Sequence, residues 1–129
     1  MARANAFIER VKYLTTVDAG GHRIIADEPP ANGGADAGPA PYDLLLASLC
    51  ACTAITLRMY ADRKQWPMTK LGVELHLTRD ADKNERIDRV LRPEGDLTTD
   101  QVARLADIAE RTPVTLTLKR GLPIITRLE

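Results

Sequence analysis

The sequence predicts an α+β protein with one long apolar helix and mostly antiparallel strand pairing. Three observations support this fold class: an apolar segment over residues 41–64, pairs of alternating segments on either side of it, and a second, amphipathic helical segment near the C-terminus. A chain of 129 residues is large enough for one core and too short for two. We therefore expect a single domain over residues 1–129.

The first third of the chain is predicted to form a hairpin followed by a loop. The stretch "AFIERVKYLTTV" alternates, with Phe7, Val11 and Tyr13 on one side, and "HRIIADE" resumes an extended pattern after a turn at residues 18–21. Proline and glycine dominate residues 29–41, which excludes a helix or a strand interior. No strand–glycine–helix unit with a lysine follows, so a phosphate-binding loop is not favoured.

The central apolar segment is predicted to be a helix. Pro41 suits its first turn, because the missing N–H is not needed there, and Pro67 marks its latest end. Residues 44–61 are apolar enough to suggest a membrane span, but Arg58 and several hydroxyl side chains interrupt them. A charge near a bilayer centre costs a few kcal/mol. A helix buried inside a soluble protein is therefore the favoured interpretation.

The second half of the chain is predicted to contain four strands and one helix. "LGVELHLTR" and "IDRVLRPEG" read as two strands joined by a charged turn. Thr98 and Gln101 fit a capping box at the start of a helix that stops before Pro113. "VTLTLKR" and "PIITRLE" are expected to be two closing strands. The predicted order is β-β-α-β-β-α-β-β.

The composition excludes several classes of partner. Eighteen basic and eighteen acidic side chains cancel, so we expect binding neither to nucleic acid nor to an anionic membrane. The N-terminus shows no secretory signal, and two cysteines then suggest a reducing cytoplasm. Neither His22 nor His76 has a cysteine or carboxylate at metal-ligand spacing. We expect no metal and no cofactor.

Cys50 and Cys52 both lie within the apolar helix. At about 100° per residue they point about 200° apart, so a disulfide between them would require the helix to unwind. Both cysteines could be small core residues, because free cysteine is among the most buried residue types. A reactive thiol would instead need a nearby positive charge and access to substrate. The residues alone leave both interpretations open.

Residues 22–67 resemble one known family. The marks are "ADEPP" with the following glycines, then "PYDLLLASL" and "ACTAITLRMYADRKQWP", and the likeness continues through "GVELHL" and "EGDLTTDQVARLADIAERTPV". They resemble the superfamily of osmotically inducible protein C (OsmC) and organic hydroperoxide resistance (Ohr) proteins, and within it the general OsmC-like branch. The resemblance implies an OsmC-like α+β fold, a long central helix on antiparallel sheet, and an intertwined homodimer.

The resemblance also implies a chemistry. Active members reduce organic hydroperoxides with two cysteines, and Cys52 matches the attacking one in the helix, whose thiolate would become a sulfenic acid. A carboxylate at the start of this helix and an arginine from the N-terminal strands hold that thiolate in the family. Asp43 and Arg23 are the nearest candidates here.

The sequence departs from the family at the second cysteine. In "IAERTPV" the resolving position is Thr112, whose hydroxyl cannot form a disulfide. One hypothesis is a thiol peroxidase of Cys52 whose sulfenic acid is resolved by an external thiol. A second is a non-catalytic protein that binds a small apolar ligand at the dimer interface, and a third is a redox sensor that crosslinks subunits or partners through a thiol.

Overall fold

A computed structural model describes residues 1–129, and the chain forms two compact units. Unit 1 comprises residues 1–45 and unit 2 comprises residues 46–129. Each unit has its own antiparallel sheet, of three strands in unit 1 and two in unit 2. The mixed architecture confirms the α+β fold class. The single domain stays a prediction.

Unit 1 is a meander of β1 (Ala4–Ile8), β2 (Thr15–Ala19) and β3 (His22–Ala26). The one long strand expected over "AFIERVKYLTTV" is wrong: the chain turns back between Ile8 and Thr15, which face each other as register partners. Because apolar and polar residues keep alternating through the turn, the pattern does not show where the strand ends. The turn expected between β2 and β3 is confirmed, with Gly20 and Gly21 at φ +56° and +84°.

The loop expected over residues 29–41 is confirmed, apart from the short 3-10 helix η1 (Pro30–Asn32). Asp27, which is 3% exposed, holds this loop from the end of β3. Its carboxylate accepts the backbone N–H groups of Tyr13, Glu28, Ala35 and Ala37. The Asp27 side chain thus accepts hydrogen bonds from backbone N–H groups that have no strand partner in the loop.

The long helix α1 (Pro41–Arg63) forms where the sequence predicts it and ends before Pro67. Its buried residues in unit 2 recur every four positions: Leu49, Thr53, Leu57 and Ala61. By length and composition alone α1 would also be able to cross a membrane. This buried stripe instead meets the other elements of unit 2.

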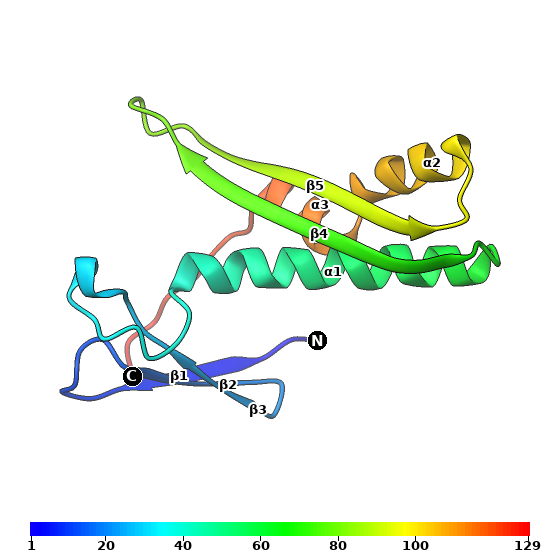
Figure 1. Cartoon of the computed structure of the whole chain (residues 1–129). Helices are drawn as coiled ribbons and strands as arrows, with labels where there is room; N and C mark the ends of the chain where they lie inside the picture. The colour runs from blue at the N-terminus through cyan, green and yellow to red at the C-terminus, as the bar shows by residue number, and fades with distance from the viewer. The chain divides into compact units, whose positions relative to one another are not determined.

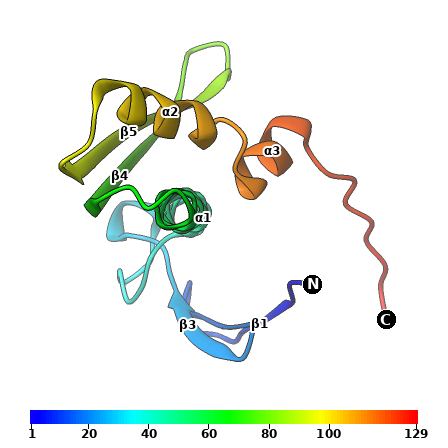
Figure 2. The same cartoon turned by 90° about the vertical axis from the view of Figure 1, so that its right-hand side faces the viewer.

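The predicted hairpin after α1 is confirmed as β4 (Met68–Arg79) and β5 (Glu85–Gly95), and it runs along α1 (Figure 1). Helix α2 (Thr99–Ala109) follows, with both hydrogen bonds of the predicted Thr98–Gln101 capping box. Figure 2, which views α1 end on, shows the hairpin and α2 beside it. These elements share one core, made of Leu57, Ala61, Met68, Leu105 and Ala109.

The two closing strands expected after residue 112 are wrong. "VTLTLKR" belongs to a helix, α3 (Pro113–Arg120), and residues 121–129 form no strand. Pro113 occupies the first helical position, where its fixed φ favours a helix start. Thr115, rather than its apolar neighbour Leu116, is the buried residue of α3. The alternation of apolar residues therefore carried no information about which side faces the core.

Candidate functional site

Cys52 lies half-buried on α1, and its sulfur meets the start of α3. The backbone N–H of Val114 donates a hydrogen bond of 3.4 Å to Cys52 Sγ. On the other side, Thr56 Oγ1 of the next helical turn lies 4.0 Å from the sulfur. A helix N-terminus carries partial positive charge on its unpaired N–H groups, which favours a negative charge placed there. The sulfur of Cys52 occupies such a position.

The Val114 N–H is available to Cys52 Sγ because the N-cap side chain of α3 does not accept a hydrogen bond from it. Thr112 is the N-cap, and its side chain makes no capping hydrogen bond. An N-cap hydroxyl would ordinarily accept from the second or third helical N–H, and Val114 is the second helical residue. The Thr112 hydroxyl instead pairs with the Thr115 hydroxyl at 2.6 Å.

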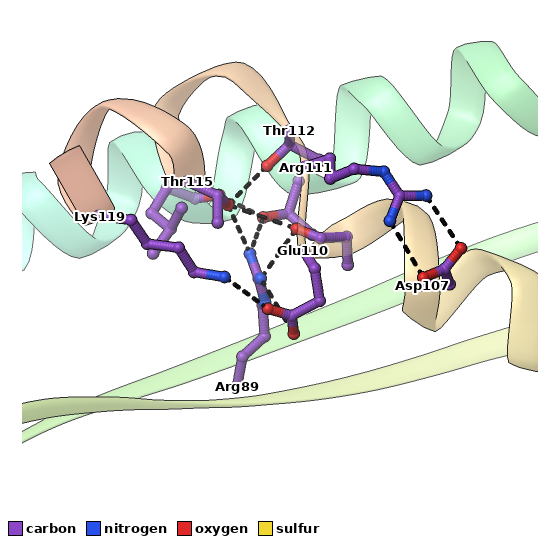
Figure 3. Close-up of polar contacts among 10 residues, drawn as sticks. Arg89, Asp107, Glu110, Arg111, Thr112, Thr115 and Lys119 are labelled. Atoms are coloured by element: carbon purple, nitrogen blue, oxygen red, sulfur yellow. Dashed lines mark hydrogen bonds and ion pairs between the residues drawn. The ribbon is translucent and has the colours of Figure 1, made fainter.

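Arg89 of β5 joins the elements around this point (Figure 3). Its Nη1 donates to the hydroxyls of Thr53 and Thr115, each at 3.0 Å. Its Nη2 donates to the backbone carbonyl of Ala109 at 2.9 Å. The Arg89 side chain is only 13% exposed. One guanidinium therefore ties the middle of α1, the end of α2 and the start of α3 to the sheet.

The carboxylate nearest to Arg89 is largely engaged elsewhere. Glu110 Oε1 lies 3.9 Å from Arg89 Nη2, whereas Glu110 Oε2 accepts a 2.7 Å hydrogen bond from Lys119 Nζ (Figure 3). The Lys119 hydrogen bond lowers the pKa of the Glu110 carboxyl. Because the Glu110 side chain is 61% exposed, solvent screens its charge. The direct partners of Arg89 are thus neutral oxygens.

Cys50 faces a different neighbour from Cys52. Its thiol donates to the backbone carbonyl of Val73 in β4 at 3.8 Å. The two thiols are free, and they approach different elements, β4 and α3, as the helical spacing predicts.

The other two predicted site residues lie in unit 1. Arg23 is on β3, where its exposed guanidinium pairs with Asp18 at 3.5 Å. Asp43 is in the first turn of α1 and accepts the backbone N–H of Ala40 at 3.2 Å. Their roles beside Cys52 stay predictions.

Arg89 is a site residue that the sequence motifs do not single out. The signal that would have found it is the alternation of β5, because Arg89 falls on the same face as Ile87 and Leu91, which are also half-buried. A cation on the inward face of a strand requires buried acceptors. Arg86 and Arg92, by contrast, are exposed and paired with the carboxylates of Asp88 and Glu74.

Unit 2 also contains an open groove of about 860 Å³, and Arg89 forms part of its wall. Cys52 does not line the groove. The larger apolar side chains that line it come from α1, β4, β5 and α3: Leu49, Leu77, Ile87, Val90, Leu91 and Leu118.

Comparison with known proteins places the chain in a family. A family model described as OsmC-like protein matches residues 33–127. No curated protein matches the chain.

Solved structures share the fold at low sequence identity. An OsmC-like protein from Mycoplasma pneumoniae superposes with a TM-score of 0.79 at 20% identity, covering 92% of this chain and 87% of the other. An organic hydroperoxide resistance protein OsmC from Legionella pneumophila gives a TM-score of 0.68 at 18% identity, covering 92% and 89%. The organic hydroperoxide resistance protein OhrB of Bacillus subtilis gives 0.60 at 21%, covering 91% and 90%. The match over residues 33–127 shows that this chain belongs to the OsmC-like protein family.

Proposed function

We propose that the protein reduces organic hydroperoxides through Cys52, with an external thiol as the resolving partner. The observation that supports this proposal is the hydrogen bond from the Val114 N–H at the start of α3 to the sulfur. The donor stabilises an anionic sulfur, which is the nucleophilic form of a thiol. Solved structures with this fold include proteins that are named organic hydroperoxide resistance proteins.

The proposed reaction has two halves. The Cys52 thiolate attacks one oxygen of the hydroperoxide, the O–O bond breaks, and the departing alkoxide takes a proton and leaves as the alcohol. The sulfur is thereby oxidised to a sulfenic acid. An external thiol then condenses with the sulfenic acid, which releases water and forms a mixed disulfide. A second thiol attacks that disulfide and restores Cys52.

The need for an external thiol follows from the side chains near Cys52. Thr112 at the start of α3 is fully buried and carries a hydroxyl, which cannot form a disulfide. Cys50 approaches the Val73 carbonyl instead of α3. A reductant with free thiols belongs to a reducing compartment, so we also propose a cytoplasmic location.

Arg23 and Asp43 complete the proposed site. In this proposal the Arg23 guanidinium stabilises the thiolate of Cys52, and the Asp43 carboxylate orients that guanidinium. Both assignments rest on the resemblance of the sequence to the OsmC and Ohr superfamily.

We also propose that the protein is a homodimer. The last residues of the chain present large apolar side chains to solvent, with Ile124 88% and Ile125 93% exposed. Ile55 and Met59 on α1 are also more than half exposed. A second copy of the chain would bury exposed apolar side chains of this kind.

The test is a stopped-flow reaction of the reduced protein with cumene hydroperoxide, in which Cys52 sulfenic acid is trapped and identified by mass spectrometry. The Cys50→Ser variant should react as fast as the wild type, and Cys52→Ser should yield no trapped product. Trapping at Cys52 well above the rate of free cysteine supports the proposal. A rate equal to that of free cysteine rejects it.

A second candidate is a non-catalytic protein that binds a small apolar ligand. The buried threonine at the resolving position and the partly apolar groove of unit 2 favour it. It predicts saturable binding of an apolar fluorescent probe to the Cys52→Ser variant as well as to the wild type. The peroxidase proposal does not require such binding.

A further inference from the structure

We infer that Arg89 is a positioning residue for Cys52. It holds the first turn of α3 so that the Val114 N–H points at the sulfur and not at the capping hydroxyl of Thr112. This inference rests on the proposed function of Cys52. It assigns a role in that function to Arg89, which makes no hydrogen bond to the sulfur.

Three helices meet at the Arg89 guanidinium. Nη1 reaches Thr53, the residue after Cys52 on α1, and also Thr115 in the first turn of α3. Nη2 reaches the carbonyl of Ala109 at the end of α2. The distance between α1 and the first turn of α3 is therefore set by two 3.0 Å hydrogen bonds from the same nitrogen.

The Thr115 hydroxyl links Arg89 to the N-cap residue of α3. It accepts from Arg89, and it lies 2.6 Å from the Thr112 hydroxyl. That contact fixes the direction of the Thr112 hydroxyl, which makes no capping hydrogen bond, although an N-cap hydroxyl ordinarily accepts from the start of its own helix. The path from Arg89 through Thr115 to Thr112 thus leaves the N–H to Cys52.

Arg89 is a largely buried charge. Burying a guanidinium is costly, and an apolar side chain of similar volume often serves stability as well or better. Arg89 directs its donors to two hydroxyls and a carbonyl rather than to a close carboxylate, since Glu110 is 3.9 Å away and is hydrogen-bonded by Lys119. Stability alone does not require a buried arginine with these three acceptors. Fixing the positions of three helices relative to one another does require it.

The experiment measures iodoacetamide alkylation of the reduced full-length protein. Fragment-ion mass spectrometry gives separate rates for Cys52 and Cys50, so that Cys50 is an internal reference in every sample. The variants are Arg89→Met, Thr115→Val and Thr115→Ser. Arg92→Met, on the same strand but in an exposed ion pair with Glu74, is the matched control.

We expect the ratio of the Cys52 rate to the Cys50 rate to fall about threefold in Arg89→Met and Thr115→Val. A helix-terminal donor stabilises a negative charge modestly, and the lower intrinsic nucleophilicity of a stabilised thiolate offsets part of the gain. Thr115→Ser keeps the hydroxyl and should keep the wild-type ratio, as should Arg92→Met. General loosening of the fold would raise alkylation of both thiols, the opposite of the expected fall.

An unchanged ratio of the Cys52 rate to the Cys50 rate in Thr115→Val overturns the inference. Valine has nearly the same shape as threonine, so this variant tests the inference even if Arg89→Met does not fold. Alkylation requires no peroxide. If Cys52 alkylation responds to these variants while the wild type reduces cumene hydroperoxide no faster than free cysteine, the proposed function fails and the positioning role stands. If peroxide reduction is rapid and the alkylation ratio is unchanged, the proposed function stands and the positioning role fails.

Discussion

The hydroxyl oxygens of Thr112 and Thr115 lie 2.6 Å apart at the start of α3, and neither residue is more than 5% exposed. The Thr112 side chain thus stands beside the same helix turn whose Val114 N–H reaches Cys52 Sγ. An N-cap side chain ordinarily lies beside the second or third helical N–H, and here the second one donates to the sulfur. We therefore expect position 112 to be within reach of Cys52.

Thr112→Cys is expected to create a two-cysteine cycle. After one equivalent of cumene hydroperoxide, the introduced thiol should condense with the Cys52 sulfenic acid, and an intramolecular disulfide should replace the trapped product. Non-reducing peptide mapping by mass spectrometry detects the crosslinked peptides. Arg120→Cys places a thiol at the exposed far end of α3 and should form no such bond. Absence of the disulfide in Thr112→Cys would contradict the geometry proposed here.

Asp27 should make the stability of unit 1 depend on acid pH. The Ala37 N–H is the largest cause that lowers the pKa of this carboxyl below 3.8, and Glu28, Ala35 and Tyr13 act in the same direction. A lowered folded-state pKa contributes stability that is fully present above the unfolded pKa and is lost as pH falls through the folded one. Thermal unfolding followed from about pH 7 to about pH 3 should show the Tm fall below about pH 4.

Asp27→Asn removes the charge at every pH. We expect it to lower the Tm at neutral pH and to flatten the acid dependence, because an amide NH₂ would face backbone donors. Asp36→Asn is the matched control in the same loop, since asparagine tolerates the φ of +54° found there. Equal Tm values for Asp27→Asn and the wild type at neutral pH would show that the loop does not depend on this carboxylate.

Thr98→Ala should destabilise unit 2 through the start of α2. The substitution removes the acceptor for the Gln101 N–H and half of the capping box. Such losses cost about 1 kcal/mol of unfolding free energy. Urea unfolding followed by far-UV circular dichroism measures it. Thr99→Ala, one residue into the helix, should leave the midpoint nearly unchanged, and equal midpoints for both variants would contradict the role of the cap.

The exposed C-terminal residues give a test of the proposed homodimer. Replacing both Ile124 and Ile125 by glutamate puts charge on surface that a second copy would bury, so light scattering after size exclusion should show a smaller species than the wild type. Thr126→Glu adds one charge in the same segment and should leave the mass unchanged. A wild-type mass equal to one chain would reject the dimer outright.

Local pattern was enough to predict α1, the β4–β5 hairpin and α2. Pro41, the alternation after Pro67 and the Thr98–Gln101 capping box each act within a few residues of the element they specify. Their information is therefore present in short windows of sequence. The same holds for the position of Cys52 relative to Cys50, which follows from helical geometry alone.

Tertiary structure decided the rest. "VTLTLKR" alternates as a strand would, but the buried partners of Thr112 and Thr115, together with Pro113, make it a helix. Arg89 carries the same side chain as Arg86 and Arg92 on the same strand. Only the packing of α1, α2 and α3 over one face of β5 gives Arg89 alone three buried acceptors. The sequence determined the helices and strands whose signals are local, and long-range contacts decided which side chains meet, because hydrogen bonds across 20 to 62 residues leave no periodic mark in the chain.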